Sequence, residues 1–181
     1  MTPLRASTLA LLRDFRPEDA TAVNALALAA FEQYRSAYSD WPSFAGKIGR
    51  MAALAAHGEI IVAATPATLA GAVVYMGPRA EKAACFQPDW AIIRMLVVHP
   101  EQRGQGLGRV LTEECVRRAQ RDGCAAIALH TSPIMAAALA LYRRLGFAYQ
   151  HEAPPVCGVR YGIYLKPLGC PSAGTGRKPP G

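Results

Sequence analysis

The chain has 181 residues, of which 51% are hydrophobic, and this is enough to bury the core of one ordinary domain. The charged fraction is 18% and the mean hydropathy is +0.11, so composition excludes a disordered chain. The net charge of +7 comes from dispersed basic residues without interleaved aromatic residues, which argues against a nucleic-acid surface. A polyanionic small ligand explains the charge equally well.

The sequence carries no sign of membrane insertion, export or metal binding. No apolar run reaches the roughly 18 to 20 residues of a membrane helix, and Met1 to Phe15 lacks the pattern of an export signal. The five cysteines are odd in number, scattered and never spaced as CxxC, so neither a disulfide framework nor a zinc site is expected. We therefore expect a cytoplasmic protein with no membrane partner and no metal.

The N-terminal half is predicted to combine helices and short strands. Pro17 followed by Glu18 and Asp19 is typical of a helix start, because proline fits the first turn and acids oppose the positive end of the helix dipole. Two apolar runs separated by Thr65-Pro66 indicate an antiparallel pair of strands. The predicted elements are a strand over 8–15, a helix from there to about Arg35, a helix from Asp40 to about Gly58, and strands over 59–64 and 69–76.

The C-terminal half begins with a loop over 77–89. Trp90 to Val98 is apolar except for Arg94, which predicts a central strand covered on both faces. Apolar residues at helical spacing predict an amphipathic helix from Leu107 to Gly123. The remaining predicted elements are a strand over 125–131, a helix that starts at Ser132-Pro133 and stops at Gly146, strands over 147–152 and 159–168, and a flexible tail over 169–181.

Four arginines raise separate expectations. Arg94 stands alone in an apolar strand, and because an unpaired buried charge is costly, it should either pair with a carboxylate or reach the rim. A structural ion pair is favoured over a contact with a substrate carboxylate. Arg117, Arg118 and Arg121 are interpreted as a solvated helix face, although they would also extend a positive field toward a bound phosphate.

The stretch from Arg94 to Arg109 carries the chemistry, because a buried strand runs there into a glycine-rich turn and then a helix. Gly104, Gly106 and Gly108 allow a sharp turn in which backbone N–H groups approach a phosphate, and the helix dipole adds positive potential. The spacing lacks the last glycine of a dinucleotide GxGxxG motif, and no Gly-Lys-Ser/Thr follows as in a Walker loop. The sequence thus predicts an anion site that is not of the NAD or ATP type.

This stretch resembles the acyl-CoA pyrophosphate loop of the GNAT superfamily of N-acyltransferases, in the form Arg103-x-x-Gly106-x-Gly108. A second motif of that family, Leu-Tyr-x-x-x-Gly-Phe, is present at the expected distance over Leu141 to Phe147. The order of elements agrees over 8–168. The resemblance implies an α/β fold in a single domain over 8–168, with a mixed, mostly antiparallel central sheet of about seven strands flanked by about four helices.

The resemblance also implies which residues bind acetyl-CoA and act on it. Tyr142 is implied as the acid that protonates the leaving CoA thiolate, because a tyrosine hydroxyl of pKa about 10 can donate a proton or hydrogen bond to sulfur. The N–H of Val97 is implied as the donor that polarises the thioester carbonyl. The implied cofactor-binding residues are Leu96, Val97, Val98, Arg103, Gly104, Gln105, Gly106, Leu107, Gly108 and Arg109.

The general base and the acceptor site are less defined. Where many members of the family carry a glutamate on or just before the central strand, this chain has only Arg94. The alternatives are a water chain, an acceptor amine that arrives neutral, Asp89, His130 and Glu152. The resemblance bounds the acceptor site by the segments 31–44, 77–89 and 156–161, where Tyr34, Tyr38 and Trp41 would either line a pocket or simply pack.

The leading hypothesis is an N-acetyltransferase that moves an acetyl group from acetyl-CoA to a primary amine by direct transfer in a ternary complex. Double displacement is disfavoured, since none of Cys85, Cys115 and Cys124 lies beside a histidine in an evident pair. The alternative is a CoA-binding regulatory or interaction module with little turnover, which the missing glutamate favours, and a nucleic-acid binder comes third. The terminal strands would allow a homodimer. The acceptor, a small-molecule or peptide amine, is not identified by fold.

Overall fold

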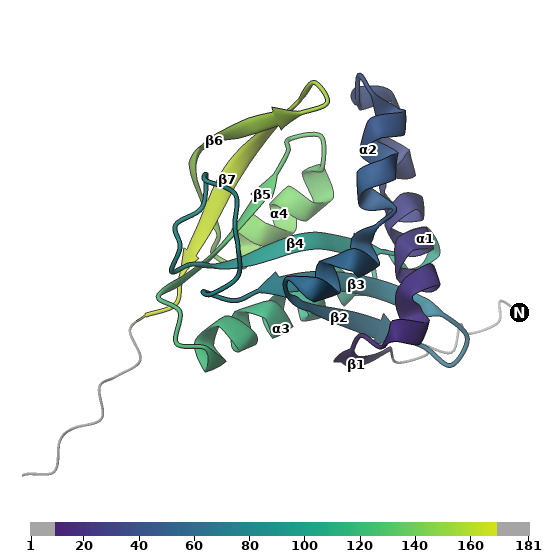
Figure 1. Cartoon of the computed structure of the whole chain (residues 1–181), viewed down its shortest axis with the longest axis horizontal. Coiled ribbons are helices and arrows are strands. Elements are labelled where there is room, and N and C mark those ends of the chain that lie inside the picture. Colours follow the sequence, from purple (N-terminus) through teal and green to yellow (C-terminus); the bar gives the residue numbers. More distant parts are fainter. Residues whose placement is uncertain (1–9, 170–181) are drawn as a thin grey trace, which may run out of the picture.

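Seven strands form one mixed sheet in the computed structural model, which describes residues 10–169 (Figure 1). The strand order is β1-β2-β3-β4-β5-β7-β6, and neighbouring strands are antiparallel except β4 and β5, which run parallel. The predicted mixed, mostly antiparallel sheet is confirmed, whereas the predicted tail from residue 170 onward lies outside the described residues. The strands are β1 (Leu11–Asp14), β2 (Glu59–Ala64), β3 (Leu69–Met76), β4 (Ala91–Val98), β5 (Ala126–Thr131), β6 (Ala148–Val156) and β7 (Val159–Pro167).

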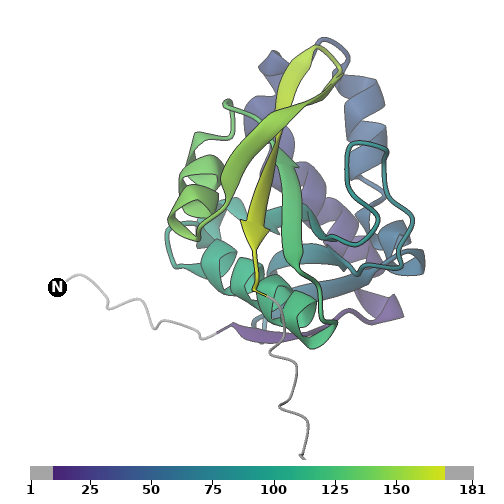
Figure 2. The same cartoon turned by 90° about the vertical axis from the view of Figure 1, so that its left-hand side faces the viewer.

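Helices cover both faces of this sheet (Figures 1 and 2). Because successive strand residues point to opposite sides, Ile60 and Ile61 enter two different cores. We call the side with α1 and α2 the α1–α2 face and the side with α3 and α4 the α3–α4 face. The helices are α1 (Ala20–Phe31), α2 (Trp41–Ile48), α3 (Leu107–Arg121) and α4 (Ala136–Arg144), with short 3-10 helices at Pro17–Asp19, Glu32–Ala37, Met51–Ala56 and Pro100–Gln102.

The helix predicted over 40–58 is interrupted. It ends at Ile48, and a separate 3-10 segment follows after Gly49-Arg50. The N–H of Ala52 in this segment donates to the side-chain oxygen of Asn24 in α1 (2.8 Å). A contact with another element therefore takes up an amide that a continuous helix would have bonded internally.

Two further helix boundaries differ from the predictions. α1 ends at Phe31, and a 3-10 turn rather than α-helix covers the stretch to Ala37. α4 begins at Ala136 and not at Ser132, because the N–H of Met135 first closes a turn on the Ser132 carbonyl (2.9 Å). Ser132 is almost fully buried at 1% exposure, so it serves as a turn residue inside the core rather than as a surface cap.

The central strands β4 and β5 diverge partway along their length. They pair only where Ala91 to Ile93 faces Ile127 to Leu129. Beyond Ile93, β4 contains a bulge opposite β3, in which Met95 has a positive φ of 53°. From the bulge to Val98, one edge of β4 is therefore free of β5. The predicted cover on both faces holds for 91–93 but fails at this divergence, where residue 94 is exposed.

Arg118 does not lie on a solvated face as predicted, since only 7% of it is exposed. Helical spacing from Leu111 and Cys115 places it on the buried side of α3. Arg117 and Arg121 are more exposed and pair with two of the same carboxylates. These cations thus stabilise the fold instead of extending a field toward a phosphate. The guanidinium of Arg118 donates to Asp14 of β1 (2.5 Å), to Glu114 of α3 (2.9 Å) and to Glu59 of β2.

Two features are absent from residues 10–169, the part of the chain that the structure describes. No helix in this range is long and apolar enough to cross a bilayer. Nor does the described part of the chain bring together three or more His, Cys, Asp or Glu side chains in a way that would hold a metal ion.

Candidate active site

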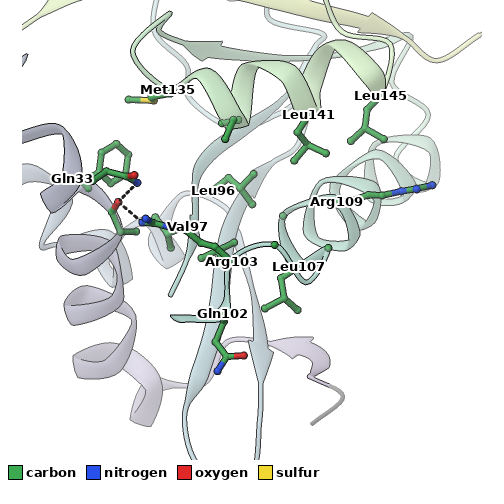
Figure 3. Close-up of a pocket in the computed structure, with 18 of the residues that line it drawn as sticks. Gln33, Leu96, Val97, Gln102, Arg103, Leu107, Arg109, Met135, Leu141 and Leu145 are labelled. Atoms are coloured by element: carbon green, nitrogen blue, oxygen red, sulfur yellow. Dashed lines mark hydrogen bonds between the residues drawn. The ribbon is translucent and has the colours of Figure 1, made fainter. Parts of the chain in front are cut away.

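A cavity of about 670 Å³ lies beside the free edge of β4 (Figure 3). Its walls come from the end of α1 and the following turn, from β4, from the turn over 102–109 and from α4. Gln105 and Tyr142, two of the predicted residues, do not line it. The predicted cofactor-binding residues that do line it are Leu96, Val97, Val98, Arg103, Gly104, Gly106, Leu107, Gly108 and Arg109.

Part of the apolar wall was not predicted. On α4 and at its C-terminal end it includes Ala138, Leu141 and Leu145, and Figure 3 shows the side chains of Leu141 and Leu145 on one side of the helix. Their spacing of three and four residues was a usable signal for an apolar helix face. Phe31 and Met135 complete the apolar wall, and no local pattern distinguishes them from ordinary core residues.

Two glycines of the turn are required by backbone conformation. Gly104 and Gly106 have φ angles of +76° and +82°, which residues with side chains rarely adopt. Gly106 caps α3, and its carbonyl accepts hydrogen bonds from the N–H groups of Arg109 (3.0 Å) and Val110 (3.2 Å). The first N–H groups of α3 have no partner within the helix, and the helix dipole adds positive potential at this end. Because this end borders the cavity, it suits a bound pyrophosphate.

The long side chains of the turn are held by protein neighbours. Arg103 donates to the carbonyl of Ala30 at the end of α1 (3.0 Å), and Gln33 donates to the same oxygen (3.0 Å; Figure 3). This bond ties the turn to the opposite wall of the cavity. Arg109 pairs with a glutamate along α3, and Gln105 donates to Gln102 while facing solvent. The turn therefore presents mainly backbone N–H groups to an anion.

The register of β4 decides which of its amides face the free edge. The N–H of His99 donates to the Ala70 carbonyl (2.8 Å), and bonded and non-bonded pairs alternate along an antiparallel ladder. Val98 is then in a non-bonded pair, so its N–H points toward the free edge. Val97, in register with Ala72, belongs to a bonded pair and directs its N–H at β3. The predicted donation from the Val97 N–H to a thioester carbonyl does not fit this direction, although Val97 lines the cavity.

Tyr142 lies in the core of the α3–α4 face and is 5% exposed. Its ring packs edge to face on Phe147, with 5.8 Å between centroids. Burial raises the pKa of the Tyr142 hydroxyl, so it stays protonated at neutral pH. Within residues 10–169 this hydroxyl has no hydrogen-bond partner. Every side-chain nitrogen or oxygen in this range that is closed off from solvent does have a partner. The Tyr142 oxygen therefore reaches accessible space even though its ring is buried.

Arg94 reaches the rim, which is one of the two outcomes predicted for it, and does not form the structural ion pair that was favoured over a substrate contact. It is exposed, and within residues 10–169 no carboxylate pairs with it. Of the three candidate bases, Asp89 is exposed in a loop, and Glu152 is exposed and paired with Arg160. His130 of β5 is half-buried, and burial, with a smaller contribution from the Arg94 charge, lowers its pKa to about 4. His130 is thus neutral at neutral pH and can accept a proton only as a weak base.

The aromatic residues predicted near the acceptor separate into two groups. Tyr34 lines the cavity, and burial raises the pKa of its hydroxyl while Arg103 opposes this rise. Tyr38 stacks on Phe44 (3.8 Å between centroids), and Trp41 packs against the same ring (5.9 Å). Tyr34 therefore belongs to the cavity, whereas Tyr38 and Trp41 pack in the core of the α1–α2 face.

A mixed sheet whose central parallel strands diverge, followed by a glycine-rich turn and a helix, is the architecture of GNAT proteins. The model of the acetyltransferase (GNAT) family matches residues 21–147, which is more than half of the chain. The chain belongs to this family.

Similarity to curated relatives is confined to short segments. The chain is 41% identical over 54 residues to a mycothiol acetyltransferase of Kocuria rhizophila, a match that covers 30% of this chain and 18% of that protein. It is 39% identical over 59 residues to the [ribosomal protein bS18]-alanine N-acetyltransferase of Escherichia coli K12, which covers 33% and 40% of the two chains. The matched segments thus span less than half of either relative.

Solved structures resemble the chain over most of its length. A GCN5-related N-acetyltransferase from Rhodopseudomonas palustris has a TM-score of 0.70 at 23% identity, covering 88% of this chain and 96% of that one. A GNAT family acetyltransferase from Brucella melitensis, solved in complex with acetyl-CoA, has a TM-score of 0.61 at 23% identity and covers 88% of both chains. At these identities the likeness establishes the fold.

Proposed function

We propose that this protein is an acetyl-CoA-dependent N-acetyltransferase that transfers the acetyl group directly to a primary amine. The observation that carries the proposal is one cavity bordered both by the start of α3 and by the free edge of β4. Pyrophosphate binds at the first N–H groups of α3, and the pantetheine arm pairs with the backbone of β4 through the Val98 N–H. The acetyl-CoA in the related Brucella structure supports the choice of donor.

The thioester of the bound donor lies near the bulge of β4, where the strands diverge. The amine nitrogen attacks the thioester carbonyl carbon, so a C–N bond forms while the C–S bond breaks and the CoA thiolate leaves. Tyr142 donates the proton that this thiolate sulfur takes up. The amine nitrogen loses its extra proton to water or to the weak base His130, and water returns a proton to Tyr142. Direct transfer requires no covalent acyl-enzyme, and Cys115, which burial keeps as a thiol with a raised pKa, is unsuited to form one.

Calorimetry with acetyl-CoA, followed by a thiol-release assay across amines, tests this proposal. The panel contains amino acids, peptides with free N-termini, lysine side chains and simple alkylamines. We expect binding and thiol release with at least one class. Binding without release for any class would favour the CoA-binding module, and absence of binding would overturn the proposal altogether.

The Tyr142→Phe variant is expected to reduce kcat about 10- to 30-fold while changing acetyl-CoA affinity by less than about twofold. The effect lies at the low end for a general acid, because a thiolate with a conjugate acid near pKa 8.5 is already a good leaving group. The hydroxyl has no hydrogen-bond partner within residues 10–169, so phenylalanine is expected to preserve the fold. Single-turnover thiol release and calorimetry measure the two quantities.

Tyr164→Phe is the matched control. Tyr164 lies in the core of the α3–α4 face and is also 5% exposed. Removal of the Tyr164 hydroxyl should therefore leave turnover unchanged. Tyr34→Phe tests the tyrosine that lines the cavity, as Tyr142 does not. If Tyr34→Phe slowed turnover and Tyr142→Phe did not, the acid would be Tyr34.

A further inference from the structure

Arg94 occupies an unusual place for an exposed charge. It lies in the middle of β4, next to Ile92 and Ile93, which are 1% and 3% exposed. Its register partner Val74 belongs to the core of the α1–α2 face, and cross-strand partners share a face, so the Arg94 side chain stands on that side. A mid-strand arginine is exposed where the cover of the sheet leaves at least the end of its side chain uncovered. The cover of the α1–α2 face is therefore open at Arg94.

The Arg94 guanidinium has no carboxylate partner in the described part of the chain. It forms neither an ion pair nor a side-chain hydrogen bond within residues 10–169, whereas Arg13, Arg118 and Arg160 each hold a carboxylate. His130 stands on the same face, because its register partner Ile163 belongs to the same core. With its pKa at about 4, His130 adds no charge at neutral pH. The open part of the sheet thus presents one free guanidinium beside a neutral imidazole.

Two aromatic side chains pack against this imidazole. Tyr161 and Phe86 lie against the His130 ring, at 5.2 Å and 6.0 Å between centroids. The Tyr161 hydroxyl shares a hydrogen bond with Tyr38 (2.5 Å), which ties β7 to the segment between α1 and α2. A ligand here meets one cation and rigid, largely apolar walls.

The opening is close to where the proposed function places the thioester. Val97 lines the cavity and packs in the same core as Val74, the register partner of Arg94, so Arg94 and Val97 stand on the same side of the sheet. Three positions separate them, with the bulge at Met95 in between, which is at most about 10 Å along the chain. An arginine side chain spans much of this length. An acceptor whose nitrogen reaches the thioester can therefore extend a second group, a few bonds away, to the Arg94 guanidinium.

The geometry points to Arg94 as the binding site for the carboxylate of the acceptor, so that the acceptor is an α-amino acid with an apolar or aromatic side chain. A single guanidinium matches a monoanion in charge, and its parallel N–H groups match the two oxygens of a carboxylate. The remaining side chain packs against the aromatic walls. This inference rests on the proposed function, since it takes the amine to be attacking a thioester beside β4.

The test uses reaction products, in which the nitrogen is acylated and does not titrate. A free acid and its carboxamide can therefore be compared without any difference in the pKa of their amines. The protein loaded with CoA is titrated calorimetrically with N-acetyl derivatives of phenylalanine, leucine and alanine, each as free acid and as carboxamide. We expect each acid that binds to do so at least tenfold more tightly than its amide. Arg94→Gln should abolish this preference, and Arg94→Lys should retain part of it. Arg50→Gln removes another exposed arginine and should leave the preference intact.

The outcomes separate the two proposals. If CoA binds but acids and amides bind equally, or if no acid binds, the role of Arg94 is overturned while the proposed function stands. A preference that persists in Arg94→Gln also overturns it. Tighter binding of the amides would indicate an acceptor without a free carboxylate, such as a peptide N-terminus. If CoA and acetyl-CoA fail to bind, the proposed function falls and the role of Arg94 falls with it.

Discussion

The Gly106→Ile variant is expected to bind acetyl-CoA at least about 100-fold more weakly than the wild type, a loss of about 2.7 kcal/mol. Gly106 has a φ of +82°, and a side chain in this left-handed region costs roughly 1–2 kcal/mol, with a β-branched residue least tolerated. Relief of this strain would rotate the turn and misdirect the N–H groups at the start of α3. The new side chain would also enter the cavity that Gly106 lines. Calorimetry measures the change in affinity.

Gly123→Ile is the matched control at the other end of α3. Gly123 has a φ of +69°, and a Cβ at Gly123, as at Gly106, would meet nothing within 4 Å. The two substitutions should therefore lower the free energy of unfolding by similar amounts, while only Gly106→Ile should weaken acetyl-CoA binding. Equal affinity in both variants would contradict the assignment of the turn to the donor. Equal loss of affinity would mean that general destabilisation causes it.

The glycine-rich turn was predictable because its signal is local. A strand, Gly104, Gly106 and a helix follow each other within a short stretch, and each has a sequence signature that depends on no distant partner. The same reason explains why β2 and β3 were predicted with their observed bounds. The mixed, mostly antiparallel sheet of about seven strands followed only from the family resemblance, and the order of the strands was not predicted, since patterning alone does not state which strands pair.

The features that were predicted wrongly depend on distant parts of the chain. Arg118 was assigned to a solvated face because its partner Asp14 lies 104 residues earlier. The break after Ile48 depends on Asn24, and the exposure of Arg94 depends on where β5 leaves β4. The direction of the Val97 N–H required the register against β3. Helical spacing from Leu111 and Cys115 does indicate the buried side of α3 for Arg118, but its carboxylate partners and the other three features are properties of tertiary contacts, which periodicity and spacing do not encode.

The Arg118→Ala variant is expected to lower the free energy of unfolding by about 2–3 kcal/mol. The Arg118 side chain is 9% exposed and joins β1, β2 and α3 through three carboxylates. Its loss leaves the Glu114 side chain, 17% exposed, without one of its two cations. The side chains of Asp14 on β1 and Glu59 on β2 are 76% and 42% exposed, so water solvates them when Arg118 is removed. The free energy of unfolding therefore falls by less than it would for a fully buried ion pair. Thermal unfolding should shift by about 5–10 °C.

Arg117→Ala is the control, because Arg117 donates to the same Glu114 but its side chain is 62% exposed. The substitution should lower the free energy of unfolding by about 0.5 kcal/mol or less.

The effect of Arg118→Ala should also depend on pH. Hydrogen bonds from Arg117 first and Arg118 second hold the pKa of Glu114 at about 2, below its unfolded value of about 4.3. Glu114 therefore contributes stability above that unfolded pKa and loses it as the pH falls toward 2. The difference in free energy of unfolding between wild type and Arg118→Ala should be largest at neutral pH and should decrease as the pH falls from about 4.3 to about 2. Equal costs for the two variants, or a difference independent of pH, would show that Arg118 acts through packing of its alkyl chain rather than through its ion pairs.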